Sequence, residues 1–139
     1  MNEHRGSPFE KIALNLLRIV TGFLFMLHGV DKLFGWFGGV GPNDAFLLGG
    51  GLELNSLAGV ASILETFGGL AVMLGLYTRQ VALVLVAEMT YVYLTRHLGR
   101  WPMQPGGGEN ALFFLFAFLY LTARGGGKLS IDGKLRGKS

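Results

Sequence analysis

The fold is decided by residues 12–34, which read IALNLLRIVTGFLFMLHGVDKLF. The stretch carries no ionisable side chain except Arg18 and the group His28, Asp31 and Lys32. At 1.5 Å per helical residue, its 23 residues are long enough to cross a bilayer. It has no convincing small-residue cleavage site, so we predict a retained transmembrane helix rather than a signal peptide.

Three further apolar segments follow, at 55–77, 81–98 and 109–123, and glycines, prolines or a tight turn separate them. Only 15% of the residues are charged, against about 25% in an average soluble domain. The sequence therefore predicts an all-α fold, an integral membrane four-helix bundle with the lipid bilayer as its partner. We expect an N-terminal tail at 1–11, a four-span membrane domain at 12–123 and a basic C-terminal tail at 124–139. Asp44 is expected to cap a short interfacial helix at 45–48.

Basic residues are divided unevenly between the two sides of such a bundle. Four spans place both termini on one side, together with eight Lys and Arg residues, whereas the other side has Lys32, Arg96 and Arg100. Because positively charged segments stay in the cytoplasm, we expect both termini to be cytoplasmic. The same rule accounts for the basic tail without nucleic-acid binding.

Ionisable side chains inside the predicted spans cost several kcal/mol in hydrocarbon unless they are paired, hydrated or neutral. Arg18 lies within the first span, and Glu65 and Glu88 lie near the middle of the second and third. Since these are the only mid-span acids, we expect Arg18 to donate a hydrogen bond to Glu65 or Glu88.

The residues leave three interpretations of these groups open. They can hold the helices together, as a structural ion pair or a proton relay, a role we assign to Arg18, Asp31, Lys32 and Asn110. They can form a ligand-binding pocket, for which we select His28, Glu65, Glu88 and Tyr91. Alternatively, one span is misplaced and its charge lies in water. No catalytic residue is assigned. Because the chain has no cysteine, we expect no metal site and no covalently bound cofactor.

Two motifs in the first span, RIVTGF at 18–23 and HGVDKLFG at 28–35, resemble the opening of DoxX family membrane proteins. The glutamates at 65 and 88, the glycines at 68, 69 and 75, and the sequence GGEN at 107–110 fit the same pattern. The resemblance covers residues 12–123 and implies a four-helix, multi-pass protein of a bacterial or archaeal inner membrane. Some members of the family are linked to thiosulfate:quinone oxidoreductase, and others to thiol-stress or copper-related operons. The resemblance therefore implies quinone as the candidate cofactor.

Three functions follow from these observations. The first is a membrane subunit associated with a quinone-linked oxidoreductase, with a polar intramembrane site. The second is a non-catalytic membrane scaffold or assembly subunit. The third is a small-solute or proton transporter, which at 139 residues would need self-association. The sequence leaves open whether the chain is itself an enzyme. Expected partners are other membrane or redox subunits, or a second copy.

Overall fold

The computed structural model describes residues 6–37, 56–105 and 107–137. The helices are α1 (Pro8–Phe34), α2 (Leu57–Leu74), α3 (Thr78–Val92), the π-helical turn η1 (Tyr93–His97), α4 (Glu109–Arg124) and α5 (Ile131–Arg136). The described residues contain no strand, so the all-α prediction is confirmed. The four predicted spans correspond to α1, α2, α3 with η1, and α4, whereas α5 was not expected. The helix predicted at 45–48 lies outside the described residues.

Capping residues explain where the first two long helices begin and end. The Ser7 hydroxyl accepts a hydrogen bond from the Glu10 N–H at 3.1 Å, and proline follows at the first helical position. As a result α1 begins four residues before the predicted start. Gly35 and Gly75 close α1 and α2 in the left-handed conformation, with φ of 68° and 73°. Glycine adopts this conformation without the steric cost of a side chain.

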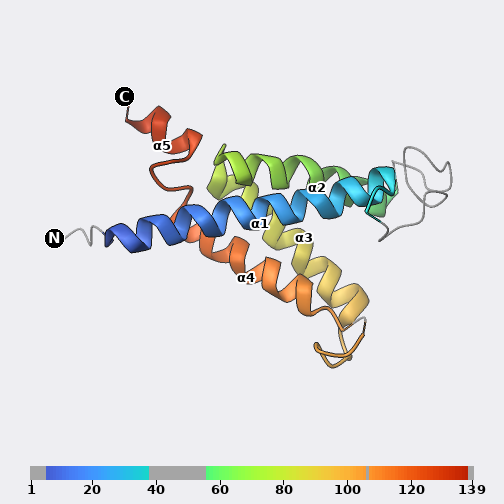
Figure 1. The fold of residues 1–139 in the computed structure, drawn as a ribbon. Coiled ribbons are helices and arrows are strands. Elements are labelled where there is room, and N and C mark those ends of the chain that lie inside the picture. Colours follow the sequence, from blue (N-terminus) through green and yellow to red (C-terminus); the bar gives the residue numbers. More distant parts are fainter. Residues whose placement is uncertain (1–5, 38–55, 106, 138–139) are drawn as a thin grey trace.

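The helices pack as two pairs, α1 with α2 and α3 with α4 (Figure 1). The pairs lie together at the end where α1 begins and diverge toward the opposite end (Figure 1). Glycines allow the α1–α2 backbones to touch. A Cβ on Gly22 would lie 2.5 Å from the Met73 nitrogen, and one on Gly69 would lie 2.5 Å from the Met26 nitrogen. Such small-residue contacts are typical of helices that associate within a bilayer.

The buried and exposed faces of α1 are reversed relative to a soluble helix. Its buried face includes the polar residues Asn15, Arg18, Thr21 and Asp31. Its exposed face is apolar, with Leu16, Leu17, Ile19, Val20, Phe23 and Leu24. Exposed apolar surface of this extent, around a polar interior, is what a lipid environment requires. Among the described helices, α1 and α2 have the length and apolarity of membrane spans.

The core draws on all four long helices. Phe25 of α1 packs against Phe114 and Phe118 of α4, with ring centroids 5.0 and 4.8 Å apart. Leu85 and Met89 of α3 belong to the same buried cluster. This apolar centre separates two polar regions, one at each end of the bundle.

Candidate intramembrane polar site

The best-defined ion pair of the bundle joins α1 to α2. Lys32 Nζ lies 2.7 Å from Glu65 Oε1, and the Glu65 side chain is only 4% exposed. The pair forms where the two backbones are close, because a Cβ on Gly29 would lie 2.5 Å from the Thr66 nitrogen. Lys32 belongs to the last turn of α1, so its ammonium group reaches the mid-helix acid of α2 from the end of the bundle opposite the termini.

Glu88 lies at the same level as Glu65 on the neighbouring helix. Gly68 of α2 packs against the Leu85 side chain of α3, where an added Cβ would lie 2.9 Å from Leu85 Cδ2. The two helices are antiparallel. Three residues back from Gly68 on α2 is Glu65, and three residues on from Leu85 is Glu88. The charges of Glu65 and Lys32 both act on the Glu88 carboxyl. These three residues are hereafter the polar cluster.

Three oxygen atoms of the polar cluster are buried without a hydrogen-bond donor among the described residues. They are both carboxyl oxygens of Glu88 and the second oxygen of Glu65, Oε2. Buried polar atoms are nearly always hydrogen-bonded, and an unsatisfied one costs about 1–3 kcal/mol. The cluster can therefore accept hydrogen bonds from a ligand and, through Lys32, donate one.

The other two predicted ligand-binding residues are exposed, unlike these buried oxygens. His28 is exposed, and its ring packs edge-on against Phe114 of α4 at a centroid distance of 5.4 Å. Tyr91 is 51% exposed. The structure thus brings Glu65 and Glu88 together and leaves His28 and Tyr91 on outer surfaces. Their role in ligand binding stays a prediction.

The predicted partner of Arg18 was wrong. Its guanidinium is 1% exposed and donates to backbone carbonyls: Val72 and Met73 near the end of α2, and Gly126 beyond α4. The carbonyls in the last turn of a helix lack intrahelical donors and carry the negative end of the helix dipole. Arg18 therefore donates hydrogen bonds to carbonyls at the end of α2, and Glu65 pairs with Lys32 instead.

Asp31 and Asn110 take up positions near the ends of helices. Asp31 Oδ1 accepts a hydrogen bond from the Phe37 N–H at 2.7 Å, which fixes the chain leaving α1. Asn110 is exposed in the first turn of α4 and lines a groove of about 470 Å³ between that helix and the connection from η1.

The segment after α4 is folded against the bundle, a contact that the sequence did not reveal. The Asp132 carboxylate accepts hydrogen bonds from the N–H groups of Tyr77 and Thr78, each at 2.8 Å, at the start of α3. Burial alone would raise the pKa of Asp132, but these hydrogen bonds and the charge of Arg136 lower it below its ordinary value. The sequence signal was the pattern Ser130-Ile131-Asp132-Gly133, in which Ser130 caps α5 and accepts from the Gly133 N–H.

Comparison with known proteins places the chain in a family. The DoxX family model matches residues 13–98, more than half of the chain. An uncharacterized protein of Haemophilus influenzae is 35% identical over 133 residues, covering 87% of this chain and 89% of its own. A Bacillus subtilis protein named "Putative oxidoreductase CatD" is 30% identical over 128 residues, covering 91% and 89%. No solved structure matches the chain. The polar interior of α1, its apolar exterior and the family match agree, and the chain belongs to the DoxX family of membrane proteins.

Proposed function

We propose that this protein is a membrane subunit of a quinone-linked oxidoreductase and that its polar cluster holds the quinone head group. The observation that carries the proposal is the pair of buried Glu88 oxygens with no donor among the described residues. A quinone head group presents carbonyl oxygens when oxidised and hydroxyl groups when reduced. Lys32 and a protonated Glu88 can donate to the carbonyls, and the oxygens of Glu65 and Glu88 can accept from the hydroxyls.

Quinone reduction consumes two electrons and two protons, and the chain's own contribution concerns the protons. Glu88 lies beside a second acid and a cation, an arrangement in which a proton can pass between neighbouring groups. The electrons would come from a redox partner subunit, because the sequence offers no cysteine for thiol chemistry. The name of the Bacillus subtilis relative supports an association with oxidoreductases.

A scaffold function is the second candidate, and one observation favours it. The Lys32–Glu65 pair and the close α1–α2 contact at Gly22 and Gly69 already give the polar groups a structural role. On this alternative the cluster only fixes the helix register. Extraction of the purified protein with organic solvent, followed by mass spectrometry, separates the two candidates. Stoichiometric quinone supports our proposal, and quinone at the level of an unrelated membrane protein purified alongside it supports the scaffold.

We further propose a multi-pass orientation in the inner membrane with both termini in the cytoplasm. Figure 1 shows α1 beginning and α4 ending at the same end of the bundle, with α5 beside them. The excess of basic residues on that side supports the orientation. Alkaline phosphatase fused after Lys138 should be inactive and a fusion within residues 41–51 active; the reverse result would refute the orientation.

A further inference from the structure

A second groove lies at the end of the bundle where α1 begins, and it shares no residue with the polar cluster. Its volume is about 1170 Å³, and it lies between the start of α1, the α2–α3 turn and the segment after α4. Its lining includes one acidic side chain, Asp132, and five cationic ones: Lys11, Arg79, Arg124, Lys128 and Arg136. Three different helices and the C-terminal segment contribute these cations. The positive charge is therefore brought together by the fold and does not come from one continuous stretch of sequence.

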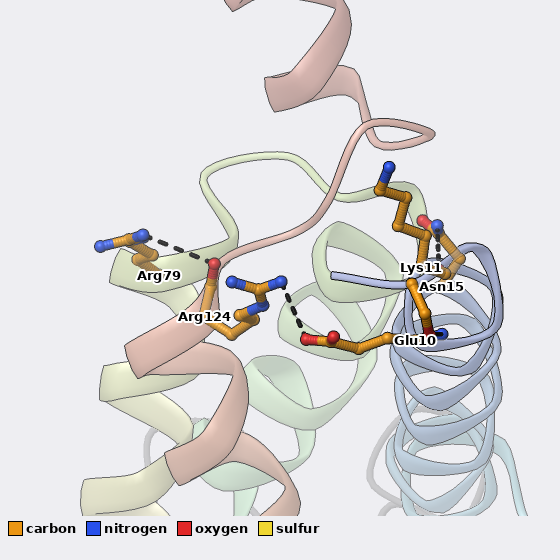
Figure 2. A network of polar contacts seen from close by, with 6 residues as sticks. Glu10, Lys11, Asn15, Arg79 and Arg124 are labelled. Atoms are coloured by element: carbon orange, nitrogen blue, oxygen red, sulfur yellow. Dashed lines mark hydrogen bonds and ion pairs between the residues drawn. The ribbon is translucent and has the colours of Figure 1, made fainter. Parts of the chain in front are cut away.

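Two of these cations, Arg79 and Arg124, already form hydrogen bonds within the protein. Figure 2 shows Arg79 donating to the Arg124 carbonyl at 3.4 Å and Arg124 donating to Glu10 at 3.1 Å. Asp132 is committed to the N–H groups at the start of α3. The N–H groups of Tyr77 and Thr78 at the start of α3 are therefore already hydrogen-bonded. An anion in the groove would have to bind to cationic side chains instead. Lys11 and Lys128 are exposed, and neither ammonium group pairs with an acid among the described residues.

The groove also offers apolar contacts beside its cations. Leu14, buried in the core, and Leu135, 60% exposed, line the same space. Phe9 and Ile12 are 77% and 57% exposed on the first turns of α1. Cations next to exposed apolar side chains at the end of a membrane bundle match an amphiphile, whose head group is anionic and whose chains are apolar.

We infer that this groove binds the phosphodiester head group of an anionic phospholipid, with Lys11 and Lys128 as the principal cations. Their side chains flank the groove from α1 and from the C-terminal segment, so a phosphate between them would link the two. Bound lipid would thereby stabilise the docking of residues 125–137 on the bundle. The inference is independent of the quinone proposal, because the groove and the polar cluster share no residue.

The test compares lipids and matched variants of the full-length protein. Melting temperature in neutral detergent is measured with added phosphatidylglycerol, phosphatidylcholine or inorganic phosphate, and lipid affinity is measured by native mass spectrometry. We expect phosphatidylglycerol to raise the melting temperature and phosphatidylcholine not to. The double variant Lys11→Gln/Lys128→Gln should bind phosphatidylglycerol about thirtyfold more weakly, since two basic residues at about 1 kcal/mol each near an anionic surface contribute about 2 kcal/mol. Lys134→Gln is the control, because Lys134 is exposed in α5 but does not line the groove.

Two outcomes would overturn the inference. Equal phosphatidylglycerol affinity in the double variant and in Lys134→Gln would mean that the groove cations do not bind the head group. Stabilisation by inorganic phosphate without stabilisation by phosphatidylglycerol would mean that the groove takes a soluble anion and not a lipid.

Discussion

Lys32 Nζ and Glu65 Oε1 lie 2.7 Å apart, and the pair joins the last turn of α1 to the middle of α2. The two ends differ in their surroundings, because the side chain of Lys32 is 39% exposed and that of Glu65 only 4%. The lysine thus brings a charge from the rim of the bundle to an acid in its interior. Glu88 of α3 lies at the same level of the bundle as Glu65, so the ion pair and Glu88 together form the polar cluster.

Removing one partner of this pair should cost more than removing both. Lys32→Met leaves the Glu65 carboxylate without its donor, so we expect the free energy of unfolding to fall by about 1–3 kcal/mol. Lys32→Met combined with Glu65→Leu should recover part of the loss, because apolar residues often replace a buried pair at little cost. Reversible unfolding in mixed detergent micelles measures the coupling energy. A double-variant loss equal to the sum of the single losses would show that the pair does not stabilise the fold.

Arg18 should be far more important to stability than an exposed arginine. Arg18→Met leaves the carbonyls of Met73 and Gly126 without the guanidinium donor, and we expect a loss of about 3 kcal/mol. Arg124→Met is the control, because its pair with Glu10 is about half exposed and such pairs contribute roughly 0–1 kcal/mol. The Arg18 variant should also be cleaved faster by protease within residues 125–130. Similar unfolding and cleavage in both variants would contradict the role assigned to Arg18.

Adjacent glycines on α2 should respond differently to alanine. A Cβ on Gly69 would meet backbone atoms of α1, 2.5 Å from the Met26 nitrogen and 2.7 Å from the Gly22 oxygen, so the helices must separate. We expect Gly69→Ala to destabilise by about 1–3 kcal/mol. Gly68→Ala meets only the movable end of Leu85 and gains up to about 1 kcal/mol of helix propensity. Thermal unfolding of the two variants side by side decides the matter, and equal melting temperatures would exclude the close α1–α2 contact.

Asp132 should make stability depend on pH in the acid range. Its folded-state pKa is lowered from the ordinary 3.8, so its contribution is fully present above that value and is lost as the pH falls through the folded pKa. Asp132→Ala should therefore lower the melting temperature at pH 6, by an amount corresponding to about 1 kcal/mol, and the difference from wild type should shrink below about pH 3.8. A difference that is constant between pH 6 and pH 3 would show that the carboxylate charge is not what caps α3.

The long helices could be predicted because each is an apolar run bounded by residues with strong local preferences. Gly35 follows the predicted first span and Gly108 precedes the predicted fourth, and the structure confirms these two ends. The first helix begins earlier than predicted, after Ser7, and the second ends earlier, before Gly75. The acids of the polar cluster were also identifiable, since Glu65 and Glu88 interrupt otherwise apolar spans. The long helices and the two acidic residues inside them could therefore be predicted from local sequence alone.

The partners of the charged groups could not be predicted, because they depend on how the helices pack. Arg18 was assigned to an acid on the assumption that only side chains compensate a charge, whereas the end of α2 offers carbonyls. Lys32 reaches Glu65 only in the register that Gly29 sets against α2. The contact of Asp132 with the start of α3 spans more than fifty residues of sequence. Each case required the tertiary structure.

A titration with a quinone shows whether the polar cluster holds the quinone head group. Decylubiquinone is titrated into the purified protein in detergent micelles, and its Kd is measured by quenching of tryptophan fluorescence. Glu88→Gln keeps the shape of the side chain but cannot supply an acidic proton. We predict that it weakens binding by about tenfold or more, since a hydrogen bond to a charged or acidic group contributes about 1.5–3 kcal/mol. Glu109→Gln, at the exposed start of α4, should bind as wild type does. If wild type, Glu88→Gln and Glu109→Gln share one Kd, the polar cluster does not hold the quinone head group, which contradicts the proposed function.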